Sequence, residues 1–340
     1  MVRVAVITGP GRVEIREEPQ PVPEPDELLV AVDACGLCTL ERRLFSGEKR
    51  LYPVAAGHEV AGRVVAVGDA VRDLAGAPRI GELVTADFLT RCGSCSACRR
   101  GRTAMCKRPQ GGALSDGTIT MGGGLTDMVK VRARQTWACG DAPVEHAAMG
   151  EPLACVAHSI RLSGVRAGDR VAIIGVGYMG RLHLAATRAL GAASVGAVDI
   201  SDVRRQDARR ANASWVATPD EALQRAGDQD VVFVTAGVPG SLELAVSLCD
   251  AGGTVVLYGA FPRDHRATVD PDALHHHEIT VVGVYSHEPE DWRVAAGWIR
   301  SGALAGDLDA LVTARFQLDA VADALTLVAG SPVYRVLVGG

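Results

Sequence analysis

The chain has 340 residues, a length that predicts about two domains, each large enough to bury a core of its own. Apolar residues make up 48% of it and the net charge is −5, which argues against nucleic acid or an acidic membrane surface as a main partner. No apolar run approaches the roughly 20 residues of a membrane-spanning helix, and Met1–Ile7 lacks the cleavage site of a secretion signal. We therefore expect a cytoplasmic protein.

The amino-terminal part of the chain is predicted to be rich in β-strands. Its apolar segments are short, alternate with polar residues or run continuously, and are separated by turns that contain proline or glycine. We expect strands at Met1–Ile7, Arg12–Arg16, Leu28–Ala34 and Val60–Val67.

Three separated segments carry residues that are typical metal ligands. They are Gly36–Cys38 (G-L-C), Gly57–Glu59 (G-H-E) and Glu151–Leu153 (E-P-L). Zn²⁺ binds thiolate, imidazole and carboxylate groups, and a catalytic zinc site keeps one position open for substrate. We expect one such site, with these candidate ligands: Cys38, His58, Glu59 and Glu151. The residues leave open whether Glu59 or Glu151 is the resting third ligand.

Four cysteines within residues 91–108 predict a second, closed metal site. Cys92, Cys95, Cys98 and Cys106 lie in one loop, which suits a tetrahedral zinc ion bound by four thiolates. Such a site has no vacancy for substrate, so its role is structural, and metal affinity replaces a hydrophobic core in the loop. An iron–sulfur cluster is the alternative. A zinc ribbon that binds nucleic acid is disfavoured, because no aromatic residues are interleaved with the basic ones.

From Ala154 onward, apolar strands alternate with helical stretches, which is the pattern of a doubly wound α/β domain. Gly180–Gly191 is the first predicted helix, and the predicted strands are Val171–Ile174, Ser194–Asp199, Val231–Thr235, Thr254–Tyr258 and Ile279–Val284. Beyond Asp291 we expect two helices and a closing strand that return to the first domain, at Trp292–Arg300, Leu318–Val328 and Arg335–Val338.

Gly175, Gly177 and Gly180 form a G-x-G-x-x-G motif between the first strand and the first helix of this domain. The glycines permit a tight turn, close approach of a pyrophosphate, and close packing of helix and strand. Asp199 lies 24 residues beyond Gly175, near the spacing at which an acid accepts the ribose 2′-hydroxyl, so NAD is favoured over NADP. The residues expected to contact the dinucleotide are Gly175, Gly177, Tyr178, Met179, Gly180, Asp199, Arg204 and Thr235.

Two other groups of metal-type residues are not expected to bind a metal ion. Cys35 lies three residues before Cys38, and we expect it to pack as a small apolar side chain. His275–His277 resembles a metal-binding tract, but its position before a strand predicts a surface loop.

Taken together, these motifs resemble the zinc-dependent medium-chain dehydrogenase/reductase family, which includes alcohol, sorbitol and threonine dehydrogenases. The resemblance extends over essentially the whole chain. It implies a GroES-like β-barrel catalytic domain at residues 1–153 and 288–340, a Rossmann NAD-binding domain at residues 154–287, and a cleft between them. It also implies one catalytic and one structural zinc ion. Cys38, His58 and Glu151 match the family's catalytic zinc ligands, and Glu59 matches the acid beside the histidine, an alternative or exchanging ligand.

The sequence departs from the family at the usual proton relay. Leu40 stands where the family has a serine or threonine hydroxyl, and Arg43 stands where it has a histidine. Thr39 is the nearest hydroxyl, so the path of the substrate proton is open. Glu41 falls where the family has an acid that orients the ligand histidine.

The resemblance implies NAD-dependent oxidation of a secondary alcohol to a ketone, or the reverse, by zinc-assisted hydride transfer. A carboxylate among the ligands resembles the polyol-dehydrogenase branch, which favours a polyol, sugar or cyclitol substrate. The alternatives are a zinc-independent reductase of the same superfamily and a non-catalytic nucleotide-binding protein. By analogy with related enzymes of this length, we expect a homotetramer or a homodimer.

Overall fold

A computed structural model describes residues 1–72, 74–109 and 111–340 of the chain. The described residues divide into two compact units, Met1–Ala154 together with Glu288–Gly340, and Cys155–His287. None of the helices formed by the described residues is long and apolar enough to cross a membrane.

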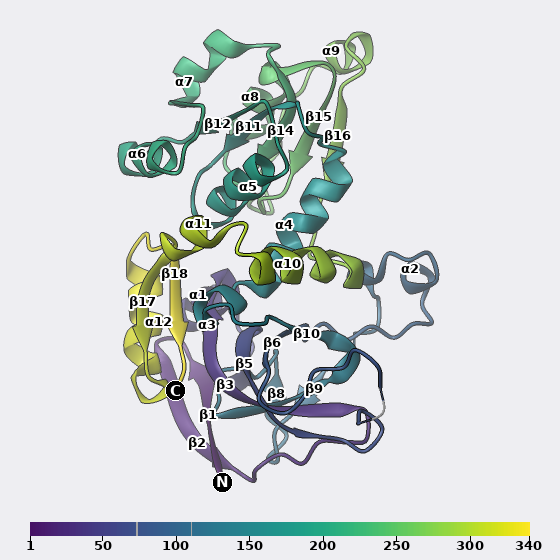
Figure 1. Ribbon diagram of the computed structural model, residues 1–340. Coiled ribbons are helices and arrows are strands. Elements are labelled where there is room, and N and C mark those ends of the chain that lie inside the picture. Colours follow the sequence, from purple (N-terminus) through teal and green to yellow (C-terminus); the bar gives the residue numbers. More distant parts are fainter. Residues whose placement is uncertain (73, 110) are drawn as a thin grey trace. The chain divides into compact units, whose positions relative to one another are not determined.

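The described part of the first unit is built around two β-sheets (Figure 1). One has the strand order β2-β1-β4-β8-β7, with β1 (Val2–Gly9), β2 (Arg12–Glu18), β4 (Val54–Ala55), β7 (Gly112–Ala113) and β8 (Ile119–Thr120). The other has the order β10-β6-β5-β3-β18-β17, with β9 also paired to β3; its strands are β3 (Glu27–Leu37), β5 (Glu59–Val67), β6 (Leu83–Ala86), β9 (Met128–Arg132), β10 (Thr136–Ala138), β17 (Val312–Phe316) and β18 (Arg335–Val338).

Short helices connect and cover these strands, and the carboxy-terminal segment completes the core. The helices are α1 (Thr39–Ser46), α2 (Ser96–Arg99), η1 (Thr103–Met105), η2 (Ala133–Gln135), α3 (Val144–Ala147), α10 (Pro289–Ser301), α11 (Ala305–Asp309), η4 (Leu318–Ala320) and α12 (Val321–Gly330). α12 packs Val321 and Leu325 into the same apolar cluster as Ile7 and Leu44. β18 pairs antiparallel with β3, so that the last strand of the chain lies beside the strand that leads to Cys38.

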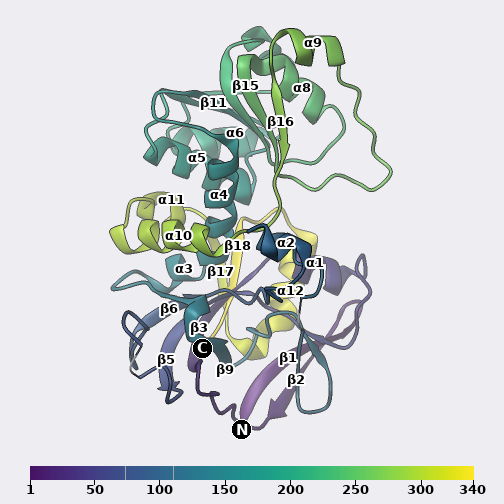
Figure 2. The same cartoon turned by 90° about the vertical axis from the view of Figure 1, so that its right-hand side faces the viewer.

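The second unit, all of whose residues are described, is one parallel sheet flanked by helices (Figure 2). Its strand order is β13-β12-β11-β14-β15-β16, with β11 (Arg170–Ile174), β12 (Ser194–Val198), β13 (Trp215–Ala217), β14 (Gln229–Val234), β15 (Cys249–Leu257) and β16 (Thr280–Gly283). The helices are α5 (Tyr178–Ala189), α6 (Asp202–Arg210), α7 (Pro219–Ala222), η3 (Leu223–Arg225), α8 (Ser241–Leu248) and α9 (Pro271–His276), while α4 (Gly150–Ser163) begins in the first unit. The strand order reverses between β11 and β14, where sheets of this type bind ligands beyond the strand carboxyl ends.

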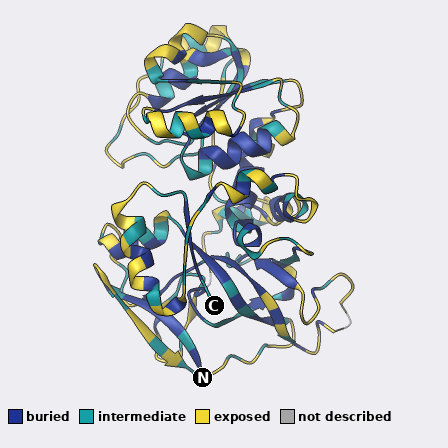
Figure 3. Ribbon diagram, turned by 60° about the vertical axis from the view of Figure 1, so that its left-hand side comes forward, coloured by how far each residue is buried: buried dark blue, intermediate teal, exposed yellow. Residues whose placement is uncertain are grey.

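The central strands of this sheet are buried on both faces. Along β11, Val171 and Ile173 join one apolar cluster, whereas Ala172 and Ile174 join another. Alternate residues of a strand point to opposite faces, so a continuous apolar run indicates a strand covered on both sides. Figure 3 shows buried residues in the central strands of the sheet and exposed residues on the outer faces of the flanking helices.

The predicted strands and helices are present, with shifted ends. β15 begins at Cys249, ahead of the predicted Thr254, and α12 is preceded by the 3₁₀ turn η4. β17 was not predicted, because its alternate residues are exposed and Thr313 and Arg315 interrupt its apolar pattern. The prediction of a loop at His275–His277 was wrong in part, since α9 continues to His276, although these histidines are exposed. Cys35 is fully buried in an apolar cluster, as predicted.

Candidate active site

Cys38 lies at the junction of β3 and α1, where its sulfur caps the helix. The Leu40 N–H donates to Cys38 Sγ at 3.1 Å, and Glu41 Oε2 accepts from the Cys38 N–H at 2.9 Å. This reciprocal capping holds the thiol at the amino terminus of α1, where the helix dipole favours a negatively charged sulfur.

His58 and Glu59 come from the turn that leads into β5. Gly57 has φ of +102°, a left-handed conformation that favours glycine, and it turns the chain so that His58 Nε2 lies 3.6 Å from Cys38 Sγ. The candidate ligand atoms of Cys38, His58 and Glu59 all lie within 4.8 Å of one another. The structure thus brings together three predicted ligands from two distant segments.

Glu41 orients the histidine from the other side of the ring. Its carboxylate is fully buried, and Oε1 lies 3.3 Å from His58 Nδ1 and accepts the Gly57 N–H at 3.1 Å. An acid on Nδ1 leaves Nε2, the nitrogen nearest to Cys38, as the one that can bind a metal.

Burial and charge shift the pKa values of these groups strongly. Burial, together with the negative charge of the nearby Glu41, raises the pKa of Cys38 to about 12. Burial also acts to raise the pKa of Glu41, but His58 and the hydrogen bonds from Cys38 outweigh it and lower that pKa to about 2. A zinc ion deprotonates a coordinating thiol, so metal binding at this site is expected to release a proton from Cys38.

Glu59 is buried beside Gly36 and Arg335. Its Oε1 lies 3.1 Å from Arg335 Nη2, and its Oε2 is buried without a hydrogen-bond partner. A Cβ atom at Gly36 would lie 2.3 Å from Oε2, so only glycine leaves room for this carboxylate. Burial raises the pKa of Glu59 to about 7 against the opposing effect of Arg335, and Glu151 contributes to the increase. An unpaired oxygen beside a thiol and an imidazole fits a zinc ion.

Glu151 and Thr39 are placed differently from this group. Glu151 opens α4, is half-buried, and does not join the grouping of Cys38, His58 and Glu59 among the described residues. Thr39 is exposed at the first position of α1. Arg43 lies in the last turn of α1 and points to Glu48, with 3.5 Å between Nε and Oε2.

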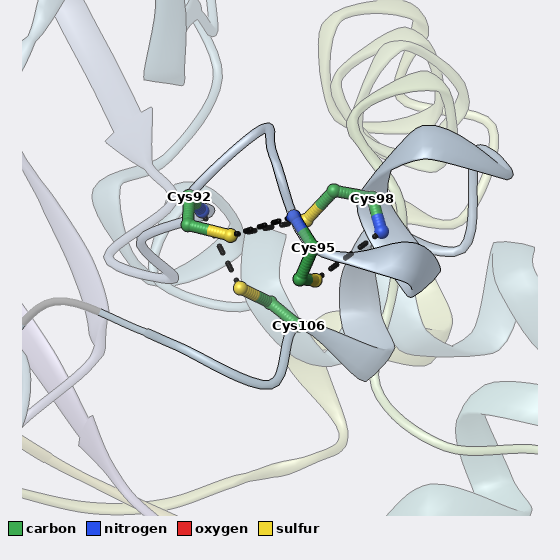
Figure 4. Close-up of side chains that lie close together, drawn as sticks. All are labelled: Cys92, Cys95, Cys98 and Cys106. Carbon is green, nitrogen blue, oxygen red and sulfur yellow. Dashed lines mark hydrogen bonds between the residues drawn. The ribbon is translucent and has the colours of Figure 1, made fainter.

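Cys92, Cys95, Cys98 and Cys106 converge in one loop, and their side chains point toward a common centre (Figure 4). The four sulfurs lie within 4.8 Å of one another, and Cys92 Sγ lies 4.0 Å from Cys98 Sγ. Four sulfurs around a tetrahedral zinc ion lie about 3.8 Å apart, given a Zn–S distance of about 2.3 Å. Hydrogen bonds from the backbone lower the pKa of Cys92 to about 6 and that of Cys95 to about 7, which favours the thiolate forms of these two residues, whereas burial and the neighbouring thiols raise the pKa of Cys98 to about 12.

The glycine motif forms a tight turn between β11 and α5. Gly175 has φ of +90°, and a Cβ atom there would lie 2.5 Å from that of Ala236. A Cβ atom at Gly180 would lie 2.0 Å from the Gly175 carbonyl oxygen, which accepts the Thr235 hydroxyl. Thr235 therefore supports the turn from the end of β14, and Tyr178 and Met179 form the first turn of α5.

Asp199 is buried at the end of β12, beside this turn. Its Oδ2 accepts the Val176 N–H at 2.9 Å, and its Oδ1 accepts the Ser201 N–H at 2.9 Å. Arg204 also lies beside the turn, since a Cβ atom at Gly177 would be 2.8 Å from Arg204 Nη1. An acid and a base thus border the place where this type of turn binds a dinucleotide.

Sequence reasoning missed Arg335 as a member of the site. Its guanidinium is buried, donates to the Leu37 carbonyl and pairs with Glu59, although 276 residues separate Glu59 from Arg335. The one signal in the sequence is a basic residue opening an apolar strand near the carboxy terminus.

Comparisons with known proteins agree with this arrangement. A family model described as alcohol dehydrogenase GroES-like domain matches residues 24–141, and one described as zinc-binding dehydrogenase matches residues 175–301. The chain is 30% identical to L-threonine 3-dehydrogenase of Thermococcus kodakarensis, over 89% of this chain and 87% of that protein. It is 30% identical to D-altritol 5-dehydrogenase of Agrobacterium fabrum, over 81% and 82% of the two chains. A crystal structure of a zinc-binding dehydrogenase from Sinorhizobium meliloti 1021 bound to NADP is 32% identical, with a TM-score of 0.88 and coverage of 100% of this chain and 99% of that one.

Proposed function

This chain belongs to the zinc-dependent medium-chain dehydrogenase/reductase family, and we propose that it interconverts a secondary alcohol of a polyol, sugar or cyclitol with the corresponding ketone. The observation that carries the proposal is the convergence of Cys38, His58 and Glu59 within 4.8 Å. A thiolate, an imidazole and a carboxylate hold zinc while leaving a position for a substrate oxygen. In a zinc-dependent dehydrogenase, such a position holds the alcohol oxygen during hydride transfer.

The chain's own residues have distinct roles in this proposal. A bound zinc ion supplies Lewis-acid chemistry, which lowers the pKa of a substrate hydroxyl. Cys38 and His58 hold the ion, and Glu41 orients His58. The substrate proton leaves through Thr39, Glu59 or water, because Leu40 has no hydroxyl.

Glu59 and Glu151 share the carboxylate role at the metal. Glu59 belongs to the group of candidate ligand atoms with Cys38 and His58. When Glu59 does not bind the metal, its charge can be balanced by the Arg335 guanidinium, which lies 3.1 Å from its Oε1. Glu151 is the second carboxylate, and its charge acts on Glu59. We propose that the two exchange as the third ligand.

The substrate class rests on the carboxylate in the donor set and on the relatives. A relative at 30% identity is named for altritol, and another at 27% identity, from Bacillus subtilis, is named for sorbitol. Another relative at 30% identity is named L-threonine 3-dehydrogenase, so amino alcohols are the substrate class to compare with polyols.

NAD is the proposed coenzyme. The Asp199 carboxylate at the end of β12 would repel the 2′-phosphate of NADP, whereas it can accept a ribose hydroxyl. The positive charge of Arg204 beside Gly177 would instead favour the 2′-phosphate of NADP, and the Sinorhizobium relative binds NADP. Measured KM values for the two coenzymes decide the matter, and Asp199→Asn is expected to reduce the preference for NAD.

A homo-oligomer is the proposed assembly. β16 lies at the edge of the sheet in the second unit, and Val281 and Tyr285 along or just after it are exposed. An exposed edge strand with apolar side chains is a template for pairing with another chain. Light scattering of the purified protein distinguishes a dimer or tetramer from a monomer.

Reduction of NAD by zinc-loaded protein with a panel of polyols, cyclitols and amino alcohols tests the activity. Cys38→Ala is expected to abolish turnover and to remove one of two zinc ions per chain. Cys35→Ala, which removes a buried thiol from β3, the strand that leads to Cys38, is the control and is expected to retain both ions. Turnover that survives in Cys38→Ala would instead indicate a zinc-independent reductase. NAD binding without turnover on any alcohol would indicate a nucleotide-binding protein.

A further inference from the structure

Glu288 connects two parts of the first unit that are far apart in the sequence. It is the first residue of the segment Glu288–Gly340, which follows the second unit, and it caps the amino terminus of α10. Only 5% of its surface is exposed, and its N–H donates to Asp291 Oδ2 at 2.8 Å. α10 itself is fixed, because Trp292 stacks on Trp137 of β10 with 4.7 Å between ring centroids. Glu288 is therefore a carboxylate on a rigid support.

The Glu288 carboxylate binds the turn that precedes Cys106. Its Oε1 accepts the Ala104 N–H at 2.9 Å, and its Oε2 accepts both the Thr103 N–H at 3.0 Å and the Thr103 hydroxyl. Thr103–Met105 form the 3₁₀ turn η1, and Cys106 ends it. Figure 1 shows α2 and its loop beside α10. Glu288 thus fixes the short turn that presents the fourth sulfur.

The cysteine loop has no carboxylate of its own for this purpose. Residues 91–109 contain six arginines and lysines and no aspartate or glutamate. At the start of the loop, Arg91 pairs with the buried Asp87, which follows β6. At the other end, Glu288 supplies the acceptors for the free N–H groups of η1. Both ends of the loop are therefore held by acids from outside it.

We propose that Glu288 is a positioning residue of the four-cysteine zinc site. It holds η1 so that Cys106 meets the other three sulfurs, and retention of this zinc ion depends on the segment that follows the second unit. The inference rests on the proposed presence of zinc in the four-cysteine loop. A charged acceptor of two backbone N–H groups and a hydroxyl is strong, and no neutral side chain replaces all three contacts.

Zinc release from Glu288→Gln tests the proposal. The amide keeps the size of the side chain but turns an N–H₂ group toward donors of η1, so at least one contact is lost. All variants carry Cys38→Ser, so that the four-cysteine zinc is the one measured, and release into an excess of a chromogenic chelator is followed over time. Release is expected to be about tenfold faster in Glu288→Gln.

Two controls separate this role from loss of stability. Glu290→Gln removes a charge from the exposed side of the same helix turn and is expected to leave release unchanged. Val64→Ala opens a cavity in another core cluster of the first unit and is expected to lower the thermal midpoint without changing release. Thr103→Ala removes one of the three donors, so it is expected to accelerate release less than Glu288→Gln, and the double variant to fall short of additivity.

The outcomes are distinct. Release from Glu288→Gln at the rate of Glu290→Gln, or equal acceleration in Val64→Ala, would overturn the positioning role. If Glu288→Gln does not fold, unchanged release from Thr103→Ala would overturn it. A parent protein that carries no zinc in the four-cysteine loop would overturn the proposed metal content itself, together with any role of Glu288 toward it.

Discussion

Glu41 and Cys38 show how single side chains prepare the candidate metal site. Glu41 accepts from the N–H of Cys38 and from the N–H of Gly57, and it lies beside His58 Nδ1. One buried acid therefore fixes the backbone at both predicted ligands and the orientation of the imidazole. A ligand set drawn from distant segments needs such a common partner, because neither segment can position the other locally.

Replacing Glu41 by Gln is expected to lower the affinity for the catalytic zinc about 10- to 100-fold. The amide cannot accept on both of its terminal atoms, so either the Cys38 or the Gly57 contact is lost. Competition with a chelator measures the affinity, and Glu48→Gln at an exposed position just after α1 is the control. An unchanged affinity in Glu41→Gln would show that His58 is held by other groups.

A side chain at position 122 is expected to displace His58, so this position requires glycine. A Cβ atom at Gly122 would lie 2.1 Å from the Gly57 carbonyl oxygen and 2.9 Å from His58 Cβ. The neighbouring Gly123 has a similar left-handed φ of +73°, but a Cβ atom there meets Thr120 at an ordinary 3.6 Å. Both alanine variants bear the backbone cost of about 1–2 kcal/mol, and Gly122→Ala is expected to lose catalytic zinc in addition. Zinc content per chain measures the difference, and equal retention in the two variants would contradict the prediction.

At the scale of elements, α5 is tied to α4 by a buried histidine. Met179 O can only accept, so His183 Nδ1, 2.8 Å away, carries the proton, and Nε2 accepts the Ser159 hydroxyl at 3.0 Å. The ring also packs against Phe233 and Tyr258. Burial lowers the pKa of His183 to about 4 from 6.5. The helix that follows the glycine turn is thus anchored by a neutral imidazole.

Because of His183, the free energy of unfolding is expected to decrease as the pH is lowered. Between pH 6.5 and 4 the unfolded chain takes up a proton that the folded chain excludes, so the free energy of unfolding decreases as the pH falls through this range. Lowering the pH from about 7.5 to about 5 is expected to remove about 2 kcal/mol through this residue. Urea unfolding at the two pH values measures the loss, which should shrink in His183→Gln. The exposed His276→Gln is the control, and an unaltered pH dependence in His183→Gln would refute the assignment.

At the scale of the whole molecule, the first unit is assembled from both ends of the chain. β18 lies between β3 and β17, and it carries Arg335 to Glu59. Near the amino terminus, Arg3 pairs with Asp127 at 2.8 Å and with Asp319 at 2.9 Å. The second unit is a continuous segment with its own sheet and its own two apolar clusters. The two units are therefore expected to depend differently on the carboxy terminus.

Removal of the last ten residues, 331–340, is expected to eliminate the catalytic zinc and to destabilise the first unit. β3 and β17 lose their shared partner strand, and the buried Glu59 loses the cation that pairs with it, which is strongly destabilising. Binding of NAD is expected to persist, because the glycine turn and Asp199 belong to the second unit. Calorimetric titration with NAD and zinc analysis test both statements, and removal of Gly340 alone is the control. Loss of NAD binding together with zinc would contradict this independence.

The sequence by itself determined the fold class, the glycine turn and the four-cysteine loop, and its G-L-C and G-H-E motifs predicted Cys38 and His58 as ligands. Each of these depends on local spacing: a strand followed by G-x-G-x-x-G, thiols a few residues apart, or a glycine beside a ligand. Such patterns are dictated by the geometry of a single turn or loop, so they can be recognised without the tertiary structure.

Only the tertiary structure showed which acids and bases lie beside these candidate sites. It grouped Glu59, and not Glu151, with Cys38 and His58, and it placed Arg335 beside Glu59. It also placed Glu288 on the turn before Cys106, 182 residues away in the chain. Contacts of this kind arise from the pairing of remote strands and helices, and a buried carboxylate that meets its partner across such a distance leaves no periodicity or spacing in the sequence.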